Sequence, residues 1–225
     1  MDVVQWGAIA LLSAGAGLDR TAVLQSLLCR PLVCAPLAGS VVGQWTTGLA
    51  IGCLLELVWL LRLPVGATVA PDDTQVAIAG TLLYAGGLIS FPLPEEAAVG
   101  FVALLCATVA GVGRHVEILV RQFNVRFSRR GLCSQGLAPR CHWCGAVAFV
   151  LGAWCSLLFC GLLIWLASFG LQWLLLLFPV PTWQGLPALL LLLAVVGLLP
   201  LLRIPHGRWL FFGSFLTTYV VAQVF

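Results

Sequence analysis

The chain has 225 residues, of which 61% are hydrophobic and only 8% are charged, whereas charged residues make up about 25% of an ordinary soluble domain. This balance excludes a water-soluble globular fold. It also excludes a disordered chain and a nucleic-acid-binding protein, because both expose many charged groups to water. The composition therefore indicates a protein whose solvent is lipid.

The few charges divide the chain into uncharged stretches whose lengths suit membrane helices, since a helix needs about 20 apolar residues to cross a bilayer core. We therefore predict an all-α polytopic membrane protein, a single domain over residues 1–225 with about six transmembrane helices and one re-entrant helical hairpin. Asp2 stands where a signal peptide would carry positive charge, so we expect the first span to be retained.

The first span is predicted over residues 3–18, and the apolar segment 31–61 follows it. The centre of that segment, Gly43-Gln44-Trp45-Thr46-Thr47-Gly48, is polar enough to form a turn. It divides the segment into two half-helices of about 12 and 16 residues, which at 1.5 Å per residue are shorter than a ~30 Å hydrocarbon core. We predict that 31–61 is a re-entrant hairpin.

Residues 62–74 contain two prolines, a glycine and two adjacent aspartates. This composition favours irregular backbone, which at membrane depth must line a cavity or a membrane surface. Two further spans are predicted after it, over about 75–91 and 97–113, with a turn at 92–96 between them.

Residues 114–142 are predicted to form a basic cytoplasmic loop whose first part is an interfacial helix. Arg121, Arg129 and Arg130 lie in it. Its apolar residues recur at helical spacing, which predicts an amphipathic helix that continues the preceding span; they are Val112, Val116, Leu119, Val120, Phe123 and Phe127. Such a helix either binds anionic lipid headgroups or docks an acidic soluble partner.

The last part of the chain is almost uncharged. The stretch 145–178 is longer than one crossing needs, so we expect it to tilt or to break near Ser168-Phe169-Gly170. The two final spans are predicted over 186–202 and 209–225.

The arginines predict the orientation, because cytoplasmic loops are rich in basic residues. If the hairpin enters and leaves the membrane on one face, all eleven basic residues lie on the cytoplasmic side, and Asp2, Glu95 and Glu96 lie on the other. Both termini are then outside.

Glu56 is the strongest candidate for a functional residue. It is the single charged group in an apolar half-helix, and a carboxylate at bilayer depth costs ~2.5 to 3.5 kcal/mol even by low estimates. A carboxylate near an indole such as Trp59 suits a sugar, because it accepts hydrogen bonds from hydroxyls while the indole packs on the ring. The alternative is a salt bridge to Arg30 or Arg62 that only holds the hairpin in place.

Asp72 and Asp73 are the next candidates. They follow Pro71 in the irregular segment, where they either close a binding site or cap the next helix. Asp73 directly precedes Thr74 and the predicted span, which is a usual N-cap position. Capping is therefore the competing interpretation for Asp73, and Asp72 is the better functional candidate.

The sequence contains no catalytic triad, phosphate loop or nucleotide fingerprint. Cys133, Cys141, His142 and Cys144 are four possible zinc ligands, but their spacing does not match the structural zinc patterns. We predict no catalytic residues, no metal site and no cofactor.

These residues resemble the IIC membrane subunit of the mannose/fructose/sorbose family of the bacterial phosphoenolpyruvate-dependent sugar phosphotransferase system (PTS). The resemblance is carried by Gly17-Leu18-Asp19-Arg20, Arg30-Pro31-Leu32, Gly39, Gly43, Thr47-Gly48-Leu49, Ile51-Gly52, Leu55-Glu56-Leu57, Val65-Gly66-Ala67, Ala70-Pro71-Asp72 and Phe211-Phe212-Gly213-Ser214-Phe215. The chain departs from the family at Gly43-Gln44, where the family usually has Gly-Asp.

The resemblance implies a sugar permease subunit in the bacterial cytoplasmic membrane. Such a subunit forms a channel for a hexose or amino sugar with a IID membrane subunit, in a homo- or hetero-oligomer, while soluble IIA and IIB subunits pass phosphate to the sugar. Mapped onto this chain, Glu56 and Asp72 contact sugar hydroxyls, with Trp45, Thr46, Thr47 and Asp73 as further candidates. The structural motif positions are Arg30, Pro31, Gly43, Gln44, Gly66 and Pro71.

Two other functions fit the sequence. In a stand-alone ion-coupled transporter, Glu56 and Asp72 would carry protons. In a degenerate scaffold or regulator that transports nothing, the basic helix at 114–130 would dock a partner, and Glu56 would matter for stability alone. Dependence on partner proteins separates both from a permease subunit.

Overall fold

The computed structural model describes residues 2–21, 26–59, 69–91, 94–127 and 138–177. All regular elements in these ranges are helices, which confirms the predicted all-α class. They are α1 (Val3–Thr21), α2 (Pro31–Val41), α3 (Trp45–Trp59), α4 (Asp73–Ala85), α5 (Glu95–Phe127) and α6 (Ala138–Leu177). The predicted spans 186–202 and 209–225, the motif 211–215 and Gly66 lie outside the described residues.

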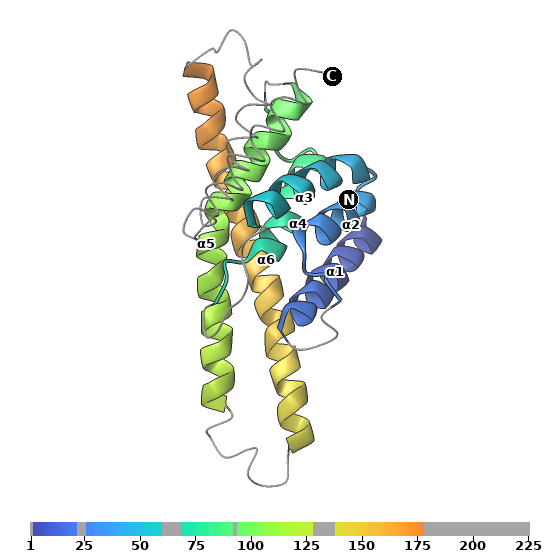
Figure 1. Ribbon diagram of the computed structural model, residues 1–225, viewed down its shortest axis with the longest axis vertical. Helices are drawn as coiled ribbons and strands as arrows, with labels where there is room; N and C mark the ends of the chain where they lie inside the picture. The colour runs from blue at the N-terminus through green and yellow to red at the C-terminus, as the bar shows by residue number, and fades with distance from the viewer. Residues whose placement is uncertain (1, 22–25, 60–68, 92–93, 128–137, 178–225) are drawn as a thin grey trace, which may run out of the picture.

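The four shorter helices gather on one side of the two long ones. Helices α5 and α6 run side by side, and their ends nearest the α5–α6 connection extend past α1–α4 (Figure 1). Helix α4 contacts α2, α3, α5 and α6, and ten of its 13 residues are buried. Helix α4 is therefore the centre of the described core.

Helices α2 and α3 form the predicted pair of half-helices. Pro31 occupies the start of α2, where its fixed φ favours a helix and its missing N–H is not needed. Gly43 turns the chain with a φ of +80°. The two helices touch through backbone, because a Cβ on Gly48 of α3 would lie 2.5 Å from the Ala35 carbonyl oxygen of α2. The structure holds two consecutive helices joined by a turn here, and the re-entrant hairpin over 31–61 stays a prediction.

The bounds of α4 and α6 differ from the predicted spans. Helix α4 ends at Ala85 rather than near residue 91, because Gly86 and Gly87, the latter with a φ of +74°, close it. Helix α5 joins the span 97–113 and the amphipathic segment into one helix of 33 residues, which agrees with the prediction that the amphipathic helix continues this span. Of the tilt or break expected near Ser168-Phe169-Gly170, the break is wrong, since α6 runs through these residues as one helix of 40 residues; the tilt stays a prediction.

Two stretches in the described part of the chain are long and apolar enough to cross a membrane, Ala97–Arg126 and Trp143–Gly170. Only 22% of the second stretch is buried within the chain, and large apolar side chains such as Trp143 and Leu158 are exposed on it. An exposed apolar surface of this extent is typical of a membrane or protein contact. Six spans and a hairpin remain the predicted topology.

Candidate functional site

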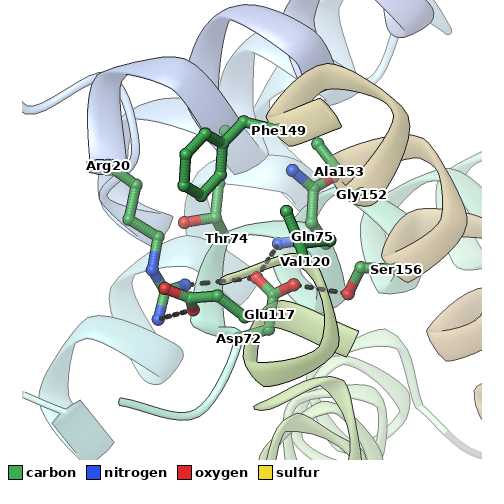
Figure 2. Close-up of a pocket in the computed structure, with 11 residues that line it drawn as sticks. Arg20, Asp72, Thr74, Gln75, Glu117, Val120, Phe149, Gly152, Ala153 and Ser156 are labelled. Atoms are coloured by element: carbon green, nitrogen blue, oxygen red, sulfur yellow. Dashed lines mark hydrogen bonds and ion pairs between the residues drawn. The ribbon is translucent and has the colours of Figure 1, made fainter. Parts of the chain in front are cut away.

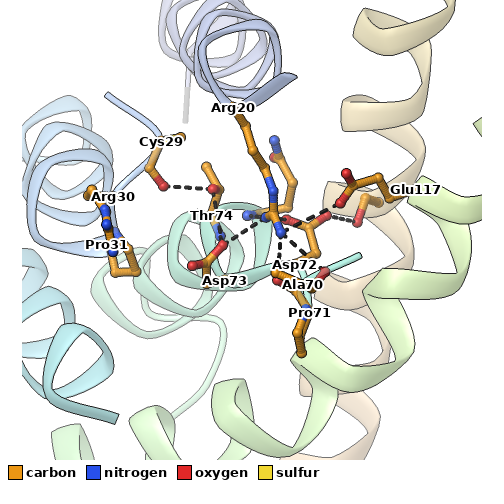
Figure 3. Close-up of polar contacts among 12 residues, drawn as sticks. Arg20, Cys29, Arg30, Pro31, Ala70, Pro71, Asp72, Asp73, Thr74 and Glu117 are labelled. Atoms are coloured by element: carbon orange, nitrogen blue, oxygen red, sulfur yellow. Dashed lines mark hydrogen bonds and ion pairs between the residues drawn. The ribbon is translucent and has the colours of Figure 1, made fainter. Parts of the chain in front are cut away.

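Arg20, in the last turn of α1, contacts three carboxylates from two other parts of the chain (Figure 3). Its Nη1 lies 3.2 Å from Asp72 Oδ1 and 2.7 Å from Asp73 Oδ1, and its Nη2 lies 3.5 Å from Glu117 Oε2. The four side chains are between 9% and 17% exposed. We call these four residues the Arg20 cluster; it joins α1, the start of α4 and α5.

Arg20 also satisfies the irregular backbone before α4. Its Nη2 donates to the carbonyl oxygens of Ala70 and Pro71 at 3.2 and 2.7 Å, and the N–H of Asp72 donates to the Ala110 carbonyl of α5 at 3.1 Å. Backbone groups that no helix pairs need such partners when they are buried. For residues 69–72 the predicted irregular backbone is confirmed.

Asp72 is the N-cap of α4, because its Oδ1 accepts from the Gln75 N–H at 3.1 Å. The capping interpretation of Asp73 is therefore wrong by one residue; Asp73 is the first residue of the helix. The second oxygen of Asp72 accepts a short hydrogen bond from the Ser156 hydroxyl of α6. With Arg20, three groups hold this carboxylate, which leaves little of it open to a sugar.

A small cavity of about 40 Å³ lies beside the Arg20 cluster (Figure 2). At roughly 10 to 15 Å³ per water it holds about three water molecules, which is less space than a hexose needs. Polar and apolar side chains of α1, α4, α5 and α6 line it: Gly17, Arg20, Asp72, Thr74, Gln75, Glu117, Val120, Phe149, Gly152, Ala153 and Ser156.

Asp19, next to Arg20 on α1, holds a second irregular segment. Its carboxylate accepts from the N–H and hydroxyl of Ser26 at 2.6 and 2.9 Å and from the Cys29 N–H at 3.1 Å. The Thr74 hydroxyl of α4 donates to the Cys29 carbonyl at 2.6 Å. Asp19 and Arg20 thus hold the entries to α2 and α4.

Glu56 lies near the end of α3, at the open end of the hairpin. Its Oε1 is 3.3 Å from Arg30 Nη1, and its Oε2 accepts from the Leu32 N–H at 3.5 Å. Both contacts are long, and the side chain of Arg30 is 34% exposed. The salt bridge of the alternative interpretation is present, yet it leaves the carboxylate more accessible than that of Asp72. The indole of Trp59 is only 5% exposed, so its faces are in the core.

The hairpin tip, defined here as residues 42–47, lies at the other end of α3. Trp45 is 57% exposed and Thr47 is 5% exposed, and Thr46 and Gln44 are exposed. Thr47 and Glu56 are nine residues apart on one helix, or about 13 Å. The structure therefore brings Glu56, Arg30, Asp72 and Asp73 to one end of the hairpin and does not bring the tip residues to them.

Sequence reasoning missed the roles of Glu117 and Ser156. Glu117 was visible as an acid within a basic helix, which is a signal for an ion pair. Ser156 stands in an apolar run, where nothing marks it as a partner of Asp72. The described side chains hold no group of three or more His, Cys, Asp and Glu residues arranged for a metal ion; Cys133 and the side chains of Cys141 and His142 lie outside them.

The chain is similar to curated sugar permeases. It is 34% identical over 98 residues to the mannose-specific EIIC component of Escherichia coli (strain K12), a match over 44% of this chain and 34% of that protein. It is 31% identical over 101 residues to the fructose permease IIC component of Bacillus subtilis (strain 168), covering 45% and 35%. A putative N-acetylgalactosamine permease IIC component of Escherichia coli is 32% identical over 140 residues, covering 62% and 97%. The first two matches span about a third of those relatives.

Solved structures share the fold. One, described as a membrane protein, has a TM-score of 0.71 at 24% identity and is matched over 99% of this chain and 91% of its own. Another, the mannose transporter ManYZ in complex with a microcin, has a TM-score of 0.60 at 24% identity, covering 97% and 87%. The family model described as the PTS system sorbose-specific IIC component matches residues 3–225. The chain therefore belongs to the sorbose-specific IIC family of the phosphotransferase system.

Proposed function

We propose that this protein is the sugar permease (IIC) subunit of a phosphoenolpyruvate-dependent PTS. It translocates a hexose or amino sugar of the mannose, fructose, sorbose or N-acetylgalactosamine type, and a IIB subunit phosphorylates the sugar on the cytoplasmic side. The observation that carries this proposal is the family match over residues 3–225. The permeases named among the relatives support the substrate class.

Glu56 is the proposed substrate contact at the open end of the hairpin. Its carboxylate has two long contacts, which sugar hydroxyls can replace or extend. Arg30 and the backbone at Leu32 fix its position. Asp72 and Asp73 take part mainly by holding the entry of α4 in place through Arg20, and a sugar reaches Asp72 only when the Ser156 hydrogen bond opens.

The proposed partners are a IID membrane subunit and soluble IIA and IIB subunits, in a homo- or hetero-oligomer in the bacterial cytoplasmic membrane. The ManYZ neighbour supports a complex of this kind. The chain itself transfers no phosphate in this proposal and needs no cofactor. Its tasks are to bind the sugar and to carry it across the lipid.

An omission assay tests the proposal. Membrane vesicles with the chain, IID, IIA, IIB and the two general phosphotransferase proteins receive labelled mannose, fructose, sorbose and N-acetylgalactosamine. We expect sugar phosphate to form from at least one sugar, and to disappear when the chain, IID or IIB is left out. Uptake that needs no partner and follows a proton gradient would support an ion-coupled transporter instead. No turnover despite normal insertion and IID association would support a scaffold or regulator.

A further inference from the structure

An apolar groove of about 370 Å³ lies between the first part of α1, α4 with the turn after it, and the middle of α6. Trp6, Leu88 and Trp165 line it and are 54%, 59% and 37% exposed, so the groove is open. Apart from two indole N–H groups, its lining consists of hydrocarbon side chains and glycine. A sugar does not suit it, because sugar hydroxyls need polar partners, and none of its lining residues belongs to the Arg20 cluster.

The groove is about as long as one leaflet of a bilayer is deep. Its α6 residues run from Leu157 to Trp165, which is about 12 Å at 1.5 Å per residue. One leaflet contributes ~15 Å, half of a ~30 Å hydrocarbon core. A transmembrane helix of a partner needs a contact face along the whole core, whereas an acyl chain lies within a single leaflet. The length of the groove therefore favours an acyl chain.

The direction of the groove follows from two contacts between α6 and the α4 segment. A Cβ on Gly161 of α6 would lie 3.7 Å from the Ala79 Cβ of α4. Eleven residues further along each segment, the side-chain amide of Gln172 donates to the Ser90 carbonyl at 2.6 Å. The two segments thus run in the same direction, and the groove between them leads toward a polar end.

Asp2 stands close to this groove, one helical turn before Trp6. The Trp6 N–H donates to the Asp2 carbonyl at 3.1 Å, and residues four apart on a helix lie on the same face. Asp2 is exposed. The face of α1 that carries Trp6 into the groove therefore begins with a carboxylate.

The charges at this end of the described structure are acidic. Gln5 of α1 donates to the carbonyl of Val41 at 3.0 Å, so the start of α1 lies at the hairpin tip, and the tip contacts exposed Glu95 at the start of α5. The described arginines lie elsewhere: in the last turn of α1, before α2 and in the second half of α5. This end therefore repels an anionic headgroup and attracts a positive one.

We propose that the groove holds one acyl chain of a phospholipid with an ammonium headgroup, and that the ammonium group lies at Asp2. Lipid tails are as apolar as leucine, so van der Waals contact with the groove walls, rather than the hydrophobic effect, holds the chain. The indole N–H groups of Trp6 and Trp165 donate to the ester and phosphate oxygens, since indoles favour the headgroup level. The inference needs a membrane protein and does not depend on the proposed sugar transport.

The test counts lipids on the purified chain by native mass spectrometry. The chain in detergent receives equal amounts of phosphatidylethanolamine and phosphatidylglycerol with the same acyl chains. We expect one phosphatidylethanolamine per chain, bound about threefold better than phosphatidylglycerol, which is the size of an exposed ion pair. Asp2→Asn abolishes this preference and still binds lipid.

Gly161→Leu fills the groove and lowers the bound lipid about tenfold, since about ten lost atom contacts correspond to that factor. Gly145→Leu, where nothing lies within 4 Å of the added Cβ, is the control on the same helix and keeps the lipid. Leu158→Trp, at a position that is 71% exposed, narrows the groove without entering the core. Its control is Leu151→Trp, which is 51% exposed and outside the groove.

The Tm of each variant is compared first, and the Leu158→Trp pair decides if Gly161→Leu does not fold. Equal lipid binding by a groove variant and its control overturns the proposal. An unaltered chain that binds no lipid, or that binds phosphatidylglycerol equally well, also overturns it. A native mass of two chains without lipid, which Leu158→Trp separates, overturns it in favour of a helix of a second copy.

Discussion

Replacing Arg20 by glutamine removes the one cation that holds three carboxylates in the Arg20 cluster. Asp72, Asp73 and Glu117 then lose their shared partner, and the carbonyls of Ala70 and Pro71 lose a donor. Breaking a buried ion pair by removing one partner costs about 3 to 5 kcal/mol. Because these side chains are 9% to 17% exposed, we take the lower end, about 3 kcal/mol.

The measurement is unfolding of the purified protein in detergent, followed by tryptophan fluorescence against denaturant or temperature. A loss of about 3 kcal/mol corresponds to roughly 6 to 12 °C in Tm for a chain of this size. Arg121→Gln is the control, because Arg121 pairs with the same Glu117 at 2.6 Å but is 50% exposed. An exposed pair four residues apart on a helix is worth about 0.3 to 0.5 kcal/mol.

A compensating variant isolates the electrostatic cause. Asp73→Asn removes one of the carboxylates that lose the Arg20 ion pair in Arg20→Gln, so the double variant is more stable than the sum of the two single losses predicts. If Arg20→Gln loses no more stability than Arg121→Gln, or if the two losses simply add, the cluster does not hold α1 to the entry of α4 as described.

Three further predictions follow from other contacts. Gly39→Ala places a Cβ 2.6 Å from a backbone oxygen of Gln44 and destabilises the protein by about 1 to 3 kcal/mol. The control is Gly145→Ala, which is neutral or stabilising because nothing lies within 4 Å of the added Cβ. Equal changes in Tm for the two variants would contradict the close packing at Gly39. Ser156→Ala removes the donor to Asp72 and lowers the free energy of unfolding by about 1.5 to 3 kcal/mol. Ser168→Ala lowers it less in the same unfolding assay, because the Ser168 hydroxyl donates to a carbonyl of its own helix at 2.6 Å. Glu56→Gln lowers the rate of sugar phosphorylation. Its Tm falls by less than that of Arg20→Gln, because the ion pair between Glu56 and Arg30 is long and partly exposed. A loss of stability as large as that of Arg20→Gln would assign Glu56 a structural role.

The sequence predicted helices and turns where local chemistry decides them. Apolar stretches marked the helices, and Gly43 with the polar residues beside it marked the hairpin turn. The end of α4 was missed because Ala85 stands in a continuous apolar pattern, and the two glycines after it close the helix by backbone conformation. The continuity of α6 was missed because a serine and a glycine break a helix only when packing does not support it.

The candidate site could be predicted only in part, because its partners come from distant parts of the chain. Glu56 and Asp72 were visible as acids in apolar surroundings, and Arg30 as a partner of Glu56. The pairing of Asp72 with Ser156, 84 residues away, depends on how α6 packs against α4. Which of two adjacent aspartates caps α4 depends on a one-residue difference in where the helix begins.

In the proposed permease subunit of a phosphotransferase complex, Glu56 binds the sugar. The most direct measurement is phosphoenolpyruvate-dependent formation of labelled sugar phosphate in complete vesicles, with the unaltered chain and Glu56→Gln at equal membrane levels and equal IID association. We expect sugar phosphate with the unaltered chain and a rate at least about tenfold lower with the variant. Equal rates would contradict the role of Glu56, and no sugar phosphate with the unaltered chain would contradict the permease function itself.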